Sequence, residues 1–152
     1  MLDSTDLKLL AALQENATAT AQELSERLNL SASQIGRRRQ RLEADGYVTG
    51  YHAHVSPERL GLHVQAFVQV SMASHTTDNA QQFQRLAHGR PEVVSLWTLT
   101  GEADYMLRVF CPSLPALNTL VHDVFLSHET VARVQTKIVM EQLKKDAGLP
   151  VG

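Results

Sequence analysis

The spacing of hydrophobic residues changes once along the chain, and this change divides it into two parts. In the first part, apolar residues recur three and four positions apart, as at Leu9, Leu10 and Leu13, which is the period of a helix with one buried face. In the second part, which starts near His63, apolar and polar residues alternate as they do in a strand. The alternating apolar positions there are Val64, Ala66, Val68 and Val70. The pattern predicts a helical head followed by a domain built on a sheet.

Three helices are predicted in the head. The first spans residues 3–16, with Ser4 or Thr5 as its cap. The second and third are joined by a turn at residues 29–30, and Gly46 can adopt the left-handed conformation that ends the third. Each of these two helices starts with a capping box, formed by Thr20 with Glu23 and by Ser31 with Gln34. Two helices joined by a short turn are the skeleton of a helix-turn-helix, whose second helix lies in the major groove of DNA.

The third helix carries an unusual density of arginine for a chain of net charge -2. Ile35 and Leu42 share one face, which we expect to pack on the second helix. Arg39 lies near this apolar stripe and can extend past it instead of touching DNA. The polar positions expected to contact phosphates and base edges are Ser31, Ser33, Gln34, Arg37, Arg38 and Arg41. The alternative is a solvated basic face on an ordinary helical domain.

The remainder of the chain predicts strands and helices in the order β-α-β-β-α-β. Residues 48–55 alternate loosely and predict a strand or wing that leaves the head, and residues 56–62 predict a hinge. Thr76 to Asp78 can cap a first helix, and Ser113 a second. The first strand of this order is the alternating stretch from Val64 to Val70. Three further strands are predicted at residues 93–100, 104–110 and 131–139. This order is typical of a ferredoxin-like sandwich, with two helices on one face of an antiparallel sheet.

The predicted fold class is therefore α+β, with a winged helix-turn-helix head and a ferredoxin-like βαββαβ domain. The predicted parts are the DNA-binding domain at 1–50, a strand and hinge linker at 51–62, the βαββαβ domain at 63–140 and a C-terminal tail at 141–152.

The composition indicates the cellular compartment of the protein but no catalytic chemistry. The chain has 152 residues, of which 43% are hydrophobic, and these are enough to bury a core. The single Cys111 excludes an internal disulfide bond and suits a reducing compartment. The start of the chain lacks the features of a signal peptide, and no apolar stretch approaches the roughly 20 residues that span a bilayer. We therefore expect a soluble cytoplasmic protein that has no membrane partner.

Several segments, taken together and in register, resemble the Lrp/AsnC (leucine-responsive/asparagine regulator) family of transcription regulators. They are LDSTDLKLLAAL, LSASQIGRRRQRLEADGYVTGY, SPERLG, TGEADYMLRV and TKIVMEQLK. The resemblance implies a homodimer paired through its C-terminal domains, which often assembles further into octamers. It also implies binding to double-stranded DNA that is tuned by a small effector, usually an amino acid. Arg39 departs from the apolar residue that the family usually has at this position.

The resemblance places the effector between C-terminal domains, beside the turn that joins the second and third strands. The implied effector residues are Thr100, Gly101, Glu102, Asp104 and Tyr105, together with Gln135 and Thr136 on the last strand. The chemistry agrees, because glycine exposes backbone N–H groups that can hold a carboxylate, and Glu102 or Asp104 can accept hydrogen bonds from an ammonium group. The alternative is a plain hairpin turn with a solvated acidic pair. Glu102 and Ala103 also differ from the Asp-aromatic pair of some members, so the effector's identity is not carried over.

The sequence predicts a sequence-specific transcriptional regulator without catalytic residues, cofactor or metal. One alternative is a ferredoxin-like small-molecule-binding protein or enzyme, with an acid–base pair at Glu102 and Asp104 and the head used for oligomerisation. Another alternative is a weakly specific, nucleoid-type DNA binder. The histidines and Cys111 lack the spacing of a zinc site, and no motif supports a nucleophile formed by Cys111 with His122 or His128.

Overall fold

A computed structural model of the chain describes residues 1–151, so Gly152, the last residue of the predicted tail, lies outside the described part. The contacts of the chain form two compact units, each with its own hydrophobic core. The first unit comprises residues 1–54 and the segment that starts at Leu143, and the second spans Val55–Gln142. None of the helices in residues 1–151 is long and apolar enough to cross a bilayer.

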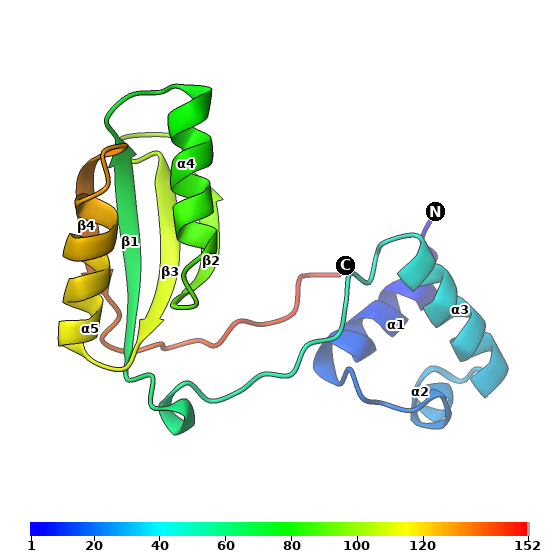
Figure 1. The fold of residues 1–152 in the computed structure, drawn as a ribbon. Coiled ribbons are helices and arrows are strands. Elements are labelled where there is room, and N and C mark those ends of the chain that lie inside the picture. Colours follow the sequence, from blue (N-terminus) through cyan, green and yellow to red (C-terminus); the bar gives the residue numbers. More distant parts are fainter. Residues whose placement is uncertain (152) are drawn as a thin grey trace. The chain divides into compact units, whose positions relative to one another are not determined.

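The first unit contains three helices, α1 (Ser4–Glu15), α2 (Ala21–Leu28) and α3 (Ala32–Ala44) (Figure 1). The capping boxes that were predicted for α2 and α3 are both present. The prediction for α1 was wrong by one position, because Asp3 is the cap and forms a capping box with Asp6. The chain turns through left-handed backbone at Asn29 (φ 53°) after α2 and at Gly46 (φ 76°) after α3, which is a common way for a helix to end.

The core of the head is the apolar stripe that the sequence predicted. Leu9, Leu24, Ile35 and Leu42 are at most 2% exposed, and Leu28 packs beside them. Burying a leucine or isoleucine side chain contributes about 1.5–3 kcal/mol, so this cluster is what fixes α3 against α1 and α2. The opposite face of α3 remains open to solvent.

The predicted strand or wing at residues 48–55 is absent. Residues 49–56 adopt no regular structure, and a short 3-10 helix, η1 (Glu58–Leu60), follows within the predicted hinge. A strand needs a neighbour for its backbone hydrogen bonds, and no other strand occurs in the described residues of the first unit. Within the described residues of the first unit, the loose alternation at 48–54 therefore has no strand to pair with.

The second unit is the predicted βαββαβ domain. Its strands β1 (Val64–Met72), β2 (Val93–Thr98), β3 (Tyr105–Cys111) and β4 (Val131–Ile138) form an antiparallel sheet in the order β2-β3-β1-β4. Its helices are α4 (Thr77–His88) and α5 (Leu114–Thr119), which continues as the π-helix η2 (Leu120–Leu126). Thr76 and Ser113 cap α4 and α5 as predicted.

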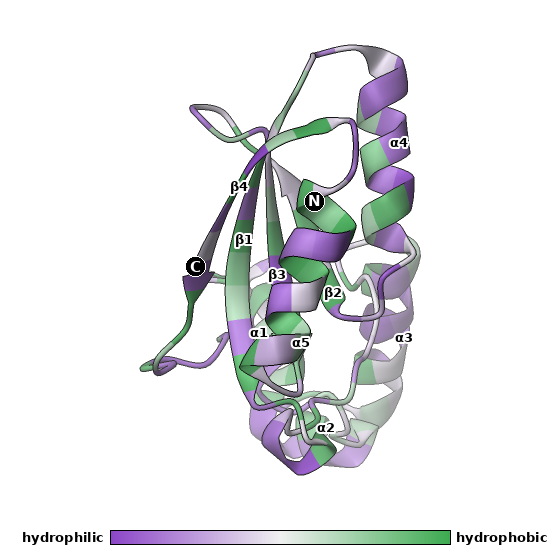
Figure 2. Ribbon diagram, turned by 60° about the vertical axis from the view of Figure 1, so that its left-hand side comes forward, coloured by the Kyte–Doolittle hydropathy of each residue, from purple (hydrophilic) through white to green (hydrophobic). Residues whose placement is uncertain are grey.

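Both helices cover the same face of the sheet (Figure 1). Figure 2 shows hydrophobic and hydrophilic residues recurring in turn along α4, which buries one side and exposes the other. Beneath the helices, Val68 and Leu107 from the central strands meet the rings of Phe83 and Phe125, and all of these are fully buried. The opposite face of the sheet carries the polar residues of the period-two pattern, together with Phe67 and Trp97.

Candidate DNA-binding face and ligand pocket

The start of α3 presents exposed polar groups. Ser31, Ser33 and Gln34 are all exposed, as predicted for a face that meets DNA. The side chains of Ser31 and Gln34 already bond to each other's backbone N–H, at 3.2 and 2.9 Å. Their main effect is therefore to hold the first turn of α3, whose N–H groups and positive dipole end favour an anion such as phosphate.

The arginines of α3 have different environments. Arg37 is exposed and has no ion-pair partner within residues 1–151. Arg38 donates to Asp3 and to Asp6, at 2.7 Å in each case, and Arg41 donates to Asp6 at 2.5 Å. The side chains of Arg38 and Arg41 are still 27% and 49% exposed. All three predicted arginines therefore reach the surface, but only Arg37 is unrestrained.

Asp6 is the centre of this cluster and is fully buried. Burial acts to raise its pKa, but the backbone N–H of Asp3 and the guanidinium groups of Arg38 and Arg41 outweigh that effect and lower the pKa below its ordinary value of 3.8. The pKa of Asp3 is also lowered, chiefly by its hydrogen bond from Arg38. The two carboxylates are thus charged at neutral pH.

Arg39 belongs to a different network on the side of α3. Its Nε donates to Glu43 at 3.1 Å and to the hydroxyl of Tyr51 at 3.0 Å, and its guanidinium lies over the Tyr51 ring. Tyr51 in turn donates to Glu43 at 2.7 Å. Burial and the Glu43 carboxylate raise the pKa of Tyr51. Arg39 therefore joins α3 to the segment that leaves the head.

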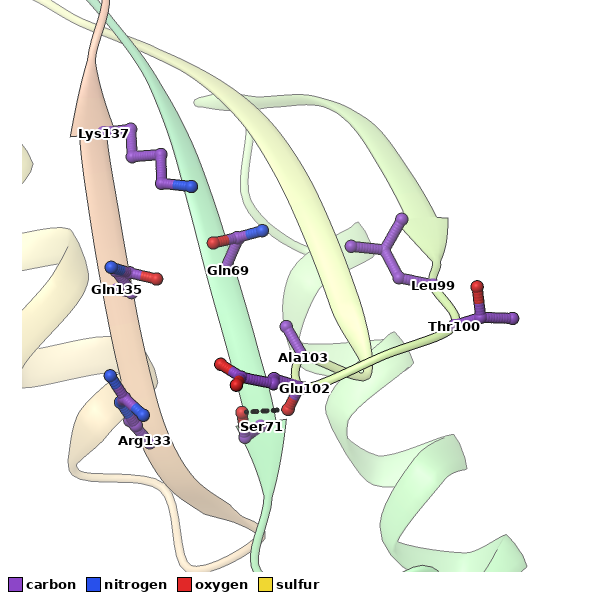
Figure 3. A pocket seen from close by; sticks show the side chains of 9 residues that line it. All are labelled: Gln69, Ser71, Leu99, Thr100, Glu102, Ala103, Arg133, Gln135 and Lys137. Atoms are coloured by element: carbon purple, nitrogen blue, oxygen red, sulfur yellow. Dashed lines mark hydrogen bonds between the residues drawn. The ribbon is translucent and has the colours of Figure 1, made fainter.

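The second candidate site is a depression of about 260 Å³ on the open face of the sheet, beside the turn between β2 and β3 (Figure 3). Gly101 in this turn has a φ of 111°, which side chains rarely tolerate, and Leu99 N–H donates to Asp104 O at 2.9 Å to close the hairpin. The lining residues are Gln69, Ser71, Leu99, Thr100, Glu102, Ala103, Arg133, Gln135 and Lys137.

Of the predicted effector residues, the structure brings Thr100, Glu102 and Gln135 to the lining of this depression. Gly101 lies in the turn beside it, exposed and outside the lining. Asp104 is occupied elsewhere, because its carboxylate accepts the N–H of Met72 at 2.7 Å, and its own N–H donates to Val70 O at 2.9 Å. That carboxylate closes the hairpin against β1, where the prediction had a ligand contact.

Tyr105 and Thr136 face the helices, not the depression. Tyr105 is 5% exposed and its ring lies 4.8 Å from that of Phe83. Thr136 pairs with Val68, whose side chain is in the core. Thr136 follows Gln135, which does line the depression, and a shift of one residue along a strand changes the face.

The sequence reasoning missed Gln69, Ser71, Arg133 and Lys137. The signal for them was present, because they share the two-residue period of Gln135 on their strands. The strand register places Gln69 opposite Gln135, and Ser71 opposite Arg133. Figure 3 shows these side chains on β1 and β4, facing the turn that carries Glu102. Ser71 donates to the backbone carbonyl of Glu102 at 3.1 Å and so ties the turn to the sheet.

The depression carries both positive and negative groups and so suits a small zwitterion. Arg133 and Lys137 supply cations from β4, and Glu102 supplies a carboxylate from the turn. Gln69 and Gln135 add groups that both donate and accept hydrogen bonds. Within the described residues, no three histidine, cysteine or acidic side chains are grouped as a metal site would require. Of the acid–base pair considered as an alternative at Glu102 and Asp104, only Glu102 lines the depression.

Comparison with known proteins agrees with both parts of the chain. Residues 65–149 match the family model of the Lrp/AsnC ligand binding domain, and residues 2–49 match that of a winged helix-turn-helix DNA-binding domain. The chain is 34% identical to the DNA-binding transcriptional activator DecR of Escherichia coli, with 99% of each chain covered. It is 35% identical to the glutamate uptake regulatory protein of Zymomonas mobilis, covering 99% of this chain and 91% of that protein.

Solved structures give the same result. A transcriptional regulator from Neisseria meningitidis, crystallised in complex with L-Met, superposes with a TM-score of 0.94 at 41% identity, covering 99% of this chain and 97% of that one. AsnC of Escherichia coli superposes with a TM-score of 0.88 at 25% identity, with 99% of both chains covered. With a helix-turn-helix head, a βαββαβ domain and these relatives along its whole length, the chain belongs to the Lrp/AsnC family of DNA-binding transcriptional regulators.

Proposed function

We propose that this regulator contacts duplex DNA with the exposed face of α3 and senses an amino acid at the depression beside the β2–β3 turn. The face is formed by Ser31, Ser33, Gln34, Arg37, Arg38 and Arg41. The observation that supports it best is the packing of α3, which buries Ile35 and Leu42 and leaves the arginines on the solvent side. Arginine forks match phosphate oxygens and the edge of guanine, so this face can supply both affinity and base recognition.

The depression has groups for both ends of a free amino acid. Arg133 or Lys137 can bind the α-carboxylate, and Glu102 can accept hydrogen bonds from the α-ammonium group. The methionine bound to the Neisseria relative supports an amino acid as effector, and Gln69 and Gln135 can exchange hydrogen bonds with its polar groups.

We further propose that the protein acts as a homodimer, paired through the open face of the sheet and able to assemble further into octamers. That face carries Trp97, which is 45% exposed, beside the half-buried Phe67 and Phe110. Aromatic residues on an exposed face are enriched at protein interfaces. Two paired heads would read half-sites about 34 Å, or a multiple of this, apart. The effector would favour one assembly over another and so change the spacing of the heads.

In this role the protein is non-enzymatic and needs no cofactor, and it acts in the cytoplasm, where its DNA is. The experiment is a selection of duplexes from a random pool by the full chain, repeated with each common amino acid. We expect one enriched sequence with two-fold symmetry, whose binding at least one amino acid changes. Sedimentation of the Trp97→Glu variant tests the assembly, and it should shift toward monomer. Failure to enrich any sequence would contradict the proposal, as would binding that no amino acid alters.

A further inference from the structure

A buried carboxylate stands directly behind the arginines of the DNA-facing helix. Asp6, in the first turn of α1, is fully buried, and charged groups are buried in proteins only when they are paired. Each of its oxygens holds one guanidinium group: Oδ1 accepts from Arg38 at 2.7 Å, and Oδ2 from Arg41 at 2.5 Å. Asp6 therefore connects α1 to two successive turns of α3.

The carboxylate of Asp6 is itself held in place. The backbone N–H of Asp3 donates to Oδ2 of Asp6 at 3.1 Å, and the backbone N–H of Asp6 donates to Oδ1 of Asp3 at 2.7 Å. The second oxygen of Asp3 accepts from Arg38 at 2.7 Å. The result is a closed network in which the start of α1 supplies a fixed acceptor for both arginines.

Arg38 and Arg41 both keep N–H donors that this network does not bond. Arg38 makes both of its bonds through one terminal nitrogen, and Arg41 makes its bond through one. A guanidinium group has several N–H donors, and within residues 1–151 the remaining nitrogens of these two side chains have no hydrogen-bond partner. Each group is anchored at one end and presents its other donors at a partly exposed surface. Arg37 lacks such an anchor.

We propose that Asp6 is a positioning residue for DNA recognition, which raises the preference for the correct sequence over other DNA. This rests on the proposed function, in which the α3 face meets the duplex. Non-specific affinity grows with the number of phosphates that cations neutralise, and the negative charge of Asp6 reduces that attraction. Base recognition instead needs a guanidinium in one orientation, and pre-organisation lowers the entropy lost on binding. Asp6 thus weakens binding to any duplex and strengthens binding to the selected one.

A purely structural role for Asp6 gives a different expectation. Loss of a cap or a buried ion pair lowers the folded fraction, and this weakens binding to all duplexes by the same factor. The ratio between affinities for a selected and a random duplex would then stay unchanged. This ratio therefore separates positioning from stability.

The test uses the full chain and the Asp6→Asn variant, which keeps the size of the side chain and removes its charge. The probes are the duplex that the wild-type protein selects from a random pool and a scrambled duplex of equal length. We expect the variant to bind the scrambled duplex at least as tightly as the wild type does, with a steeper salt dependence. Its affinity for the selected duplex should fall by about tenfold or more. Thermal melting of each variant gives the folded fraction.

Two further variants separate a positioning effect from a change of net charge and from a failure to fold. Glu15→Gln removes an equal charge from the exposed pair of Glu15 with Arg27, away from α3, and it should leave the ratio unchanged. Asp3→Asn keeps a good helix cap and removes only the second acceptor of Arg38, so it should lower the ratio less than Asp6→Asn. It decides the question if Asp6→Asn does not fold.

Three outcomes count against these proposals. If Asp6→Asn and Asp3→Asn leave the ratio at the wild-type value, the positioning role is wrong while the DNA-binding proposal stands. If Glu15→Gln lowers the ratio as much as Asp6→Asn, the effect is one of net charge, and the positioning role is again wrong. A wild-type protein that binds neither duplex would overturn the proposed function, and this inference with it.

Discussion

The guanidinium group of Arg39 lies over the ring of Tyr51, 4.8 Å from its centroid, and both side chains bond to Glu43. This network joins α3 to the segment that leads out of the head, and it accounts for an arginine beside the apolar stripe of the helix. Contacts of this kind at a surface contribute little singly, but a cation held over an aromatic ring by a shared carboxylate is more ordered than an isolated pair.

Tyr51→Phe should destabilise the head by about 0.5–1.5 kcal/mol, because it removes the hydroxyl that bonds to Arg39 and Glu43 and leaves the ring in place. Denaturant unfolding, followed by a probe in the head, measures the effect. Tyr47→Phe is the matched control, because Tyr47 is also exposed and its hydroxyl has no hydrogen bond within residues 1–151. Equal stability of the two variants would show that the Tyr51 network contributes nothing.

The stability of the head should depend on the charge of Asp6. The pKa of Asp6 is lower in the folded state than its ordinary value of 3.8, so its stabilising effect is fully present above 3.8 and is lost as the pH falls through the lower, folded pKa. Thermal melting between pH 6 and pH 2.5 should therefore show a steep decline below about pH 4. Asp6→Asn should be less stable at pH 6 and should decline less steeply. An identical pH profile for the variant and the wild type would contradict this assignment.

Binding of the effector should require a cation on β4. Arg133→Gln removes the charge from the depression while keeping a polar side chain, and it should weaken amino-acid binding by about tenfold, the loss expected for a charge-assisted hydrogen bond. Calorimetric titration, beginning with L-methionine, measures the affinity. Arg85→Gln is the control, since Arg85 is exposed on α4, on the helix-covered face of the sheet. Because Lys137 lines the same depression, a wild-type affinity in Arg133→Gln would assign the carboxylate to Lys137, and a wild-type affinity in the double variant Arg133→Gln/Lys137→Gln would place the effector elsewhere.

The segment at the C-terminus packs onto the head. The amide of Gln14 donates to Leu149 O at 3.0 Å and accepts the N–H of Leu149 at 2.5 Å, and Val151 packs against the core of the head. A Cβ at Gly148 would lie 2.9 Å from the amide oxygen of Gln14, so a larger residue there would require the Gln14 side chain to shift. Gln14→Ala should therefore release the segment and speed its proteolysis, whereas Gln40→Ala, an exposed residue of α3, should not. Equal cleavage rates in the two variants would contradict the contact.

The features that local chemistry determines could be predicted from the sequence. The capping boxes of α2 and α3, the end of α3 at Gly46 and the alternation of β1 depend only on neighbouring residues, and these predictions are confirmed. The prediction of a strand or wing at residues 48–55 was wrong, because a strand also depends on a partner elsewhere.

The candidate sites depended more on long-range contacts. The bonds from Arg38 and Arg41 to Asp6 join residues more than 30 positions apart, and no local pattern signals them. The lining of the depression depends partly on the register between β1 and β4, which brings Gln69 opposite Gln135 and Ser71 opposite Arg133. The prediction placed Asp104 in the site by its position in the turn, but its bond to Met72 N–H is tertiary.

The exposed guanidinium face of α3 should bind duplex DNA, and charge reversal at Arg37 removes one cation of that face. Arg37 is exposed and supports no other residue within residues 1–151, so Arg37→Glu should leave the melting temperature of the head unchanged. The measurement is the affinity of the full chain for its selected duplex over a series of salt concentrations, with Arg85→Glu as the control of equal charge. Arg37→Glu should lower the affinity for the selected duplex at least tenfold and make its salt dependence shallower, and Arg85→Glu should change either little. Equal affinity and equal slope for the two variants would contradict DNA binding by this face.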